Sequence, residues 1–223
     1  MSRVIAIDGP SGSGKSSVAR IVGARLGFLH VDSGALYRIV TWQCLERGVN
    51  VEAPASVAEF AAALAIECRP ENGAVAFYVG GEPPGDRIRT PRIDAAAAKV
   101  ASVKGVRDGI TGFLRGMTAY GDLVVEGRDI TTAVFPDSPA RFYLTASAEA
   151  RAARRRLQEV EKGVANQSSE AVKAALLARD RIDSTRRYAP LRKADGAVEI
   201  DSSDLTLEQV VDTVLASLPE GWR

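Results

Sequence analysis

The stretch GPSGSGKSS, residues 9–17, constrains the fold of this chain more than any other part of the sequence. Gly9 and Gly14, with the following Lys15 and Ser16, have the spacing of a phosphate-binding loop. The glycines let successive backbone N–H groups turn inward, and the helix expected from about Lys15 adds its positive N-terminal end. A short apolar run precedes the loop. The sequence therefore predicts a strand, a loop and a helix that together hold the phosphates of a nucleoside triphosphate.

Two side chains of this loop have expected chemical roles. The Lys15 ammonium supplies a mobile positive charge for the outer phosphates, and the Ser16 hydroxyl is a ligand for Mg²⁺. Asp32 is a further candidate for supporting that ion, because it ends the next expected strand. We expect the nucleotide to contact every residue of the loop, namely Gly9, Pro10, Ser11, Gly12, Ser13, Gly14, Lys15, Ser16 and Ser17.

Short apolar runs that end in polar or glycine residues recur along the chain, at 4–7, 28–31, 123–125, 142–144 and 198–200. The first four are typical of buried strands. Helical patterns lie between several of the runs, as at 16–26 and 34–47. Strands that alternate with helices predict an α/β fold with a parallel sheet.

The region from about 50 to 107 has a different pattern. It contains alanine-rich helical segments and a short apolar piece at 74–79, which the turn-forming sequence GGEPPGD follows. We expect a small insert with a short hairpin, separate from the parallel core. Near the end of the chain, 205–218 has apolar residues at helical spacing, and Thr206 and Gln209 match a capping box.

Composition excludes several classes of function. His30 is the only histidine, which argues against imidazole metal sites and Ser-His-Asp catalysis. The net charge of +1 provides no general attraction to nucleic acid or membrane, so any basic site must be local. The first residues become polar too soon for a signal peptide, and no apolar run approaches the roughly 20 residues of a membrane span. We expect a cytoplasmic chain that binds small molecules, with no nucleic-acid or membrane partner.

The phosphate-binding loop alone does not identify the phosphate acceptor. The sequence has no guanine-binding NKxD, no DxxG switch element and no LSGGQ-like stretch. These absences argue against a GTPase and an ABC-type ATPase, and they favour a kinase that acts on a small molecule.

Three charged segments indicate an anionic acceptor, although each alone could be an ordinary charged surface. In 31–38, Gly34, Tyr37 and Arg38 share one face of the expected helix, which suits a base or sugar beside a phosphate. In 124–132, charged residues follow directly after a buried strand. In 179–193, one helix face would carry Arg179, Asp183 and Arg186. A further cluster, Arg151, Arg154 and Arg155, could form a lid over the triphosphate or an ordinary solvated helix.

The chemistry of an anionic acceptor explains this use of arginine. A phosphate monoester has a second pKa of about 6, so its attacking oxygen is already charged at neutral pH and needs no general base. The reaction instead requires cations that offset the repulsion between two anions. Two alternatives stay open on these residues: a kinase of a small alcohol with Asp32 or Asp129 as the base, and a nucleotide-dependent switch without transfer.

Five stretches, in this order, resemble the bacterial cytidylate kinases of the nucleoside monophosphate kinase family: IAIDGPSGSGKSSVAR, VDSGALYR, VEGRDITTAVFPD, FYLTASAEARAARR and RDRIDSTRRYAPL. The resemblance implies transfer of the γ-phosphate of ATP to CMP or dCMP, with Mg²⁺. It implies a P-loop core with a five-stranded parallel sheet flanked by helices, at 1–49 and 108–223, with a helical lid at about 148–178. The segment 50–107 would be the monophosphate-binding insert. We expect a monomer.

The resemblance also implies roles for individual residues. Arg107 and Asp129 would contact the cytosine and its surroundings, and Asp183 the ribose. The implied catalytic residues are Lys15, Arg128, Arg179 and Arg186, and the implied ATP-binding residues outside the loop are Arg154 and Arg155. The implied substrate-binding residues are Ser33, Gly34, Tyr37, Arg38, Arg89, Arg107, Arg128, Asp129, Arg179, Asp183 and Arg186.

Two positions depart from the family pattern. Ala98 stands where the family often has a serine that contacts the base, and the lost hydrogen bond would be worth about 0.5 to 1.5 kcal/mol. Thr131 stands where many relatives have glycine after GRDI. Both positions bear on selection of the base and leave the expected reaction unchanged.

Overall fold

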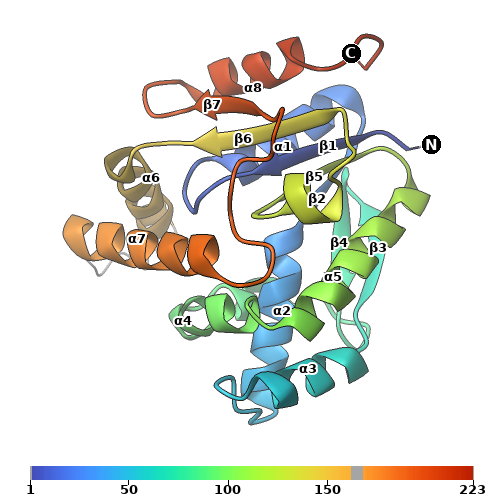
Figure 1. Ribbon diagram of the computed structural model, residues 1–223, viewed down its shortest axis with the longest axis vertical. Helices are drawn as coiled ribbons and strands as arrows, with labels where there is room; N and C mark the ends of the chain where they lie inside the picture. Colours follow the sequence, from blue (N-terminus) through green and yellow to red (C-terminus); the bar gives the residue numbers. More distant parts are fainter. Residues whose placement is uncertain (1, 162–167, 223) are drawn as a thin grey trace.

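A parallel sheet forms the centre of the computed structural model, which describes residues 2–161 and 168–222. Five parallel strands lie in the order β2-β5-β1-β6-β7 (Figure 1). Their bounds are Val4–Asp8 for β1, Leu29–Asp32 for β2, Leu123–Gly127 for β5, Ala140–Thr145 for β6 and Val198–Asp201 for β7. The five apolar runs of the sequence are these strands, so the predicted α/β class is confirmed.

The predicted number of strands is wrong, because the described residues form a sheet of seven strands. A hairpin of β3, Glu67–Glu71, and β4, Ala74–Tyr78, extends the sheet beyond β2. The expectation that this hairpin lies apart from the parallel core is also wrong. His30 of β2 pairs with Ala74 of β4, and the backbone N–H of His30 donates to Gly73 O at 3.0 Å. The hairpin thereby covers an edge strand whose backbone groups would otherwise lack partners.

Helices cover both faces of the sheet (Figure 1). Helices α1 and α8 pack on one face around Ile5, Ile7 and Phe142, while α2 and α5 pack on the other around Val31 and Leu36. The helices that surround the sheet are α1 Lys15–Leu26, α2 Ser33–Glu46, α3 Pro54–Ala63, α4 Pro91–Val100, α5 Lys104–Gly116, α6 Ala148–Glu161, α7 Ser169–Thr185 and α8 Leu207–Ala216. The capping box predicted at Thr206 and Gln209 begins α8.

Short helical turns connect some of these elements: η1 Gly85–Ile88, η2 Met117–Tyr120 and η3 Ile130–Val134, the last a π-helix. The expected insert at 50–107 contains α3, the hairpin, η1, α4 and the start of α5, so its boundary at 107 falls inside a helix. The expected lid at about 148–178 contains α6 and the first part of α7, and its residues 162–167 lie outside the described residues.

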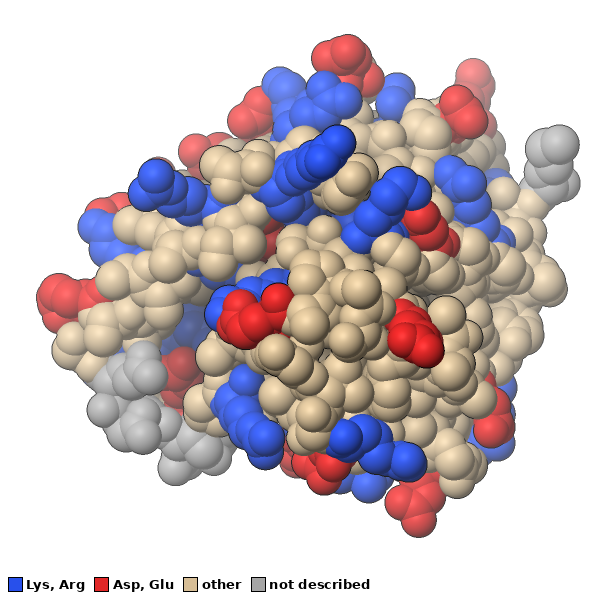
Figure 2. Space-filling model, turned by 60° about the horizontal axis from the view of Figure 1, so that its bottom comes forward, with Lys and Arg blue, Asp and Glu red and all other residues tan. Residues whose placement is uncertain are grey.

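Charged side chains of both signs are interspersed on the face shown in Figure 2. This pattern agrees with the net charge of +1. Across the described ranges 2–161 and 168–222, no helix combines the length and apolar character needed to span a membrane.

Candidate active site

The carboxyl ends of β1, β2 and β5 meet at one edge of the sheet, and a cavity of about 970 Å³ lies over that edge. Ligands of open α/β sheets bind at this kind of edge. Every predicted site residue except Gly9 and Pro10 lines the cavity. The lining therefore includes loop residues Ser11, Gly12, Ser13, Gly14, Lys15, Ser16 and Ser17, with Asp32, Ser33, Gly34, Tyr37, Arg38, Arg89, Arg107, Arg128, Asp129, Arg154, Arg155, Arg179, Asp183 and Arg186.

The phosphate-binding loop has the conformation that its glycines permit. Gly9 has φ +151°, and a Cβ at this position would lie 1.9 Å from Leu144 O, so no larger residue fits. The Lys15 ammonium is buried and donates to Pro10 O at 2.7 Å and to Ser13 Oγ at 3.4 Å. Burial, together with repulsion from Arg128, lowers the pKa of Lys15 to about 7. An anion bound in the loop would stabilise the charged form of the ammonium. The neutral oxygen atoms of Pro10 and Ser13 stabilise that form only weakly.

Ser16 and Glu126 form a pair of oxygen donors beside this loop. The Ser16 hydroxyl donates to Glu126 Oε1 at 2.5 Å, and the Glu126 side chain is buried at the end of β5. Burial raises the pKa of Glu126 to about 7, and the negative charge of Asp32 adds to this effect. A hydroxyl and a carboxylate are ligands that Mg²⁺ prefers, so these residues fit that ion. No specific role is predicted for Glu126 from the sequence, although an acidic residue directly after the apolar run 123–125 is a usable signal.

A buried ion pair also lines the cavity. Arg107 on α5 contacts Asp129, which follows β5, and each side chain is 4% exposed. Arg107 also donates to Ala101 O at 2.9 Å, and its guanidinium lies 5.3 Å from the centre of the Tyr37 ring. Among the described residues, Nε of Arg107 is buried without a hydrogen-bond partner. The ion pair is therefore held in place by several contacts, and Nε of Arg107 is still able to donate a hydrogen bond to a ligand.

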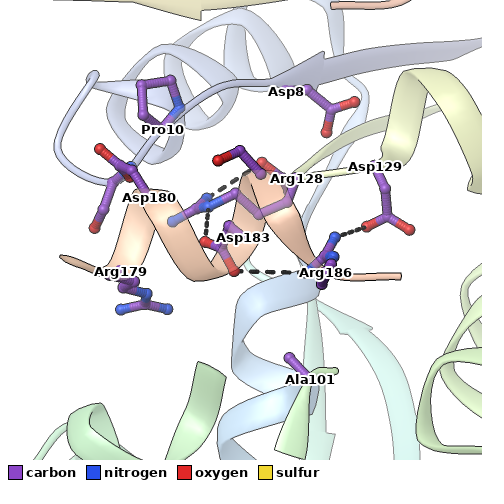
Figure 3. A network of polar contacts seen from close by, with 12 residues as sticks. Asp8, Pro10, Ala101, Arg128, Asp129, Arg179, Asp180, Asp183 and Arg186 are labelled. Carbon is purple, nitrogen blue, oxygen red and sulfur yellow. Dashed lines mark hydrogen bonds and ion pairs between the residues drawn. The ribbon is translucent and has the colours of Figure 1, made fainter. Parts of the chain in front are cut away.

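Helix α7 brings further charges to this pair (Figure 3). Asp183 accepts from Arg128 Nε at 3.1 Å and lies 3.5 Å from Nη1 of Arg186. Nη2 of Arg186 lies 3.6 Å from Asp129 Oδ1. These contacts join the loop after β5 to the end of α7, so five of the predicted residues, Arg107 included, form one continuous network.

Arg179 on the same helix lies among cations. Burial lowers its pKa to about 10, and Arg128 and Arg38 repel its charge. Its Nε is buried and has no hydrogen-bond partner within the described part of the chain. Guanidinium groups that crowd together in this way are arranged to receive an anion with several oxygen atoms.

Four other predicted residues lie in close contact with groups of the protein itself. The Ser33 hydroxyl donates to Glu126 O at 2.7 Å, which joins α2 to β5. Arg89 contacts Asp32 Oδ2 at 3.2 Å, and Asp32 also caps α2 by accepting from Ala35 N. Gly34 lies so close to Asp32 that a Cβ would be 3.0 Å from its carboxylate.

The arginines of α6 face different neighbours. Arg151 is buried, forms an ion pair with Asp180 of α7 and donates to Ser11 O at 3.2 Å. Arg154 donates to Ser202 Oγ at 2.9 Å, and that hydroxyl in turn donates to Ser13 O. The described part of α6 is thus tied to the phosphate-binding loop. Asp180 accepts from Ser11 N at 3.1 Å, a contact that the sequence pattern does not predict.

The two departures from the family pattern have different surroundings. Ala98 on α4 is 7% exposed and lines the cavity. Thr131 is fully buried, and its hydroxyl donates to Asp8 Oδ2 at 2.6 Å. Asp8 also accepts from the backbone N–H groups of Ile130 and Thr131. The Thr131 side chain therefore helps to fix the turn that carries Arg128 and Asp129.

Comparisons with known proteins identify the family of the chain. The model of the cytidylate kinase family matches residues 5–220. A cytidylate kinase of Geobacter sulfurreducens is 42% identical over 99% of this chain and 94% of its own length. One from Streptomyces griseus subsp. griseus is 44% identical over the same shares.

A solved structure of an uncharacterized protein from Eubacterium ventriosum covers 96% of both chains, with a TM-score of 0.53 and 10% identity. That likeness concerns the fold alone. The family model and the two relatives each match nearly the full length of the chain, and the chain therefore belongs to the cytidylate kinase family.

Proposed function

We propose that the chain transfers the γ-phosphate of ATP to CMP or dCMP and releases ADP with CDP or dCDP. One observation carries the proposal: a phosphate-binding loop and the buried pair of Arg107 and Asp129 line one and the same cavity. Arg38, Arg128 and Arg179 line it as well. A triphosphate donor and an anionic acceptor would both need this arrangement.

The acceptor is better explained as a phosphate than as an alcohol. An alcohol needs a carboxylate that is free to take its proton. Asp32 contacts Arg89 and caps α2, while Asp129 contacts Arg107 and Arg186. Neither carboxylate is free for that role. A phosphate acceptor needs no base, because it is already ionised at neutral pH.

The arginines would act through charge and position. Arg128 and Arg179 would bind phosphate oxygens between donor and acceptor, where charge spreads over the transferring group. Arg186 would support Asp129 and offer its buried Nη2, which has no hydrogen-bond partner in the described residues, to the same region. Lys15 would leave Pro10 O and bind the outer phosphates of the donor.

Recognition of cytosine would use the buried pair. Asp129 offers carboxylate oxygens to the exocyclic amine of the base, and Arg107 offers N–H donors to its carbonyl and ring nitrogen. Uracil has a carbonyl in place of that amine, so it would place one acceptor against another. Asp183 would accept a hydrogen bond from the sugar.

We propose that Mg²⁺ is held directly by Ser16 and, through a water molecule bound to the ion, by Glu126. When bound, the ion offsets negative charge on the transferring phosphates. We also propose that 50–107 acts as the monophosphate-binding insert and about 148–178 as the lid. The cytoplasmic location and the monomeric state stay predictions.

A panel of acceptors tests the proposal. The measured quantity is kcat/KM with ATP and each of CMP, dCMP, UMP, AMP and GMP, followed through ADP release. We expect CMP and dCMP to exceed AMP and GMP by at least about a hundredfold, since a buried polar pair left without its partner is costly. Equal turnover of AMP or GMP would reject the proposal.

A further inference from the structure

One carboxylate contacts three arginines that come from three other elements and that line the cavity. Asp94 on α4 lies 2.6 Å from Arg38 of α2, 3.1 Å from Arg155 of α6 and 3.7 Å from Arg179 of α7. In the described ranges no other carboxylate has three arginine partners. The insert is thereby joined through a single side chain to the core and to both helices of the expected lid.

The three arginines are the ones that a phosphate would be expected to use. All three line the same cavity as the phosphate-binding loop and the buried pair of Arg107 and Asp129. A carboxylate with guanidinium groups around it occupies the position of an anionic ligand, because carboxylate and phosphate offer arginine the same kind of oxygen pair.

Asp94 satisfies these arginines incompletely. Its Oδ1 is buried and accepts no hydrogen bond of good geometry from any described residue, although Arg38 and Arg179 are both near it. Nε of Arg179 is likewise buried without a partner in the part of the chain that the structure describes. A phosphate has more oxygen atoms and a larger charge, so it would satisfy the same donors better.

We propose that Asp94 is an intramolecular competitor for substrate phosphate. In the nucleotide-free protein it holds Arg38, Arg155 and Arg179 together and latches the insert to α6 and α7. An incoming phosphate displaces the carboxylate, takes over its guanidinium partners and releases the latch. The inference deepens the proposed phosphate-transfer function and rests on it.

The variant Asp94→Asn tests the competition. It keeps the shape of the side chain and removes the charge that competes with phosphate. We expect binding of CMP, measured by calorimetry without ATP, to tighten by roughly two- to fivefold, the effect of losing one partly exposed charge contact. The KM for CMP should fall by the same factor while kcat stays within about twofold of the unaltered protein.

A matched control removes the same charge elsewhere in the insert. Glu59 is exposed on α3, and Glu59→Gln should leave both CMP binding and KM unchanged. Inorganic phosphate serves as a second probe, and it should also bind Asp94→Asn more tightly than the unaltered protein. This second probe separates the two proposals, because it reports on the latch even if CMP is not the substrate.

Two outcomes would overturn the proposal. If Asp94→Asn binds CMP and inorganic phosphate with unchanged or weaker affinity, Asp94 does not compete with phosphate. If the variant instead loses kcat with unchanged KM, Asp94 positions the arginines for catalysis and is not displaced. Circular dichroism and a thermal melt check that the variant is folded.

Discussion

Replacing Thr131 by valine probes the buried carboxylate that fixes the site turn. Valine has nearly the shape of threonine, so the change removes a hydroxyl and creates no cavity. The lost contact is the 2.6 Å hydrogen bond to Asp8, whose side chain is fully buried. Burial raises the pKa of Asp8 to about 6, and the hydrogen bonds from Thr131 act in the opposite direction.

The expected cost depends on the charge of Asp8. At pH 8 the carboxylate is ionised, and a hydrogen bond to a charged acceptor is worth about 1.5 to 3 kcal/mol. At pH 5 the carboxyl is mostly protonated, and the same contact is worth about 0.5 to 1.5 kcal/mol. We therefore expect Thr131→Val to destabilise the fold by about 1 to 1.5 kcal/mol more at pH 8 than at pH 5, which corresponds to a further rise of about one unit in the pKa of Asp8.

The direction of this pH dependence follows from the linkage between proton binding and folding. The pKa of Asp8 is higher in the folded protein than the ordinary value of 3.8. Its contribution to stability is therefore complete below about pH 4 and is lost as the pH rises through about 6. In Thr131→Val the pKa of Asp8 is still higher, so this variant loses more stability over the same pH range, and the loss extends to a higher pH.

Urea unfolding at pH 5 and pH 8 measures these differences. Thr132→Val is the matched control, because the Thr132 hydroxyl is buried with no hydrogen-bond partner among the described residues. It should change the free energy of unfolding little, and equally at both pH values. An equal cost of Thr131→Val at the two pH values, or a cost no larger than that of Thr132→Val, would refute the assignment.

Three further predictions concern activity. The pKa of Glu126 is raised to about 7, so its carboxylate is mostly ionised at pH 8 and mostly protonated at pH 6. The kcat/KM for MgATP of the unaltered protein, divided by that of Glu126→Gln, should therefore fall about tenfold from pH 8 to pH 6. A quotient that does not depend on pH would contradict the role of Glu126 in metal binding. Arg186→Ala should lower kcat by about 10²- to 10³-fold, as loss of a contact to transition-state charge does, and normal kcat and KM would remove Arg186 from the site. Ala98→Ser should lower the dissociation constant of CMP by roughly two- to tenfold if the added hydroxyl reaches the base, and calorimetry that shows no change would disprove this.

Local sequence patterns were sufficient to predict those parts of the fold and of the site whose geometry is set by a short stretch of the chain. The glycines and Lys15 of the loop predict a phosphate site because its geometry is set within nine residues. The charged residues after Val31 and Val125 were expected near the cavity because parallel strands end at the same edge. The structure places both groups there.

Features that depend on distant partners were missed. The hairpin joins the sheet through His30 and Ala74, and its alternating pattern alone cannot specify which edge it meets. Glu126 lies beside Ser16 although 110 residues separate them in sequence. Asp94 gains its three arginine contacts only when α2, α4, α6 and α7 come together. Such roles arise from tertiary proximity, which residue spacing does not encode.

The central claim is that one phosphoryl group moves from ATP onto the phosphate of a cytidine monophosphate. Phosphorus-31 NMR of a reaction with ATP, Mg²⁺ and CMP tests it most directly, because each phosphate has its own resonance. The account predicts that the β-phosphate of CDP appears as the γ-phosphate of ATP disappears, in equal amounts. Release of inorganic phosphate in place of CDP, or a phosphate attached to a sugar hydroxyl of CMP, would contradict it.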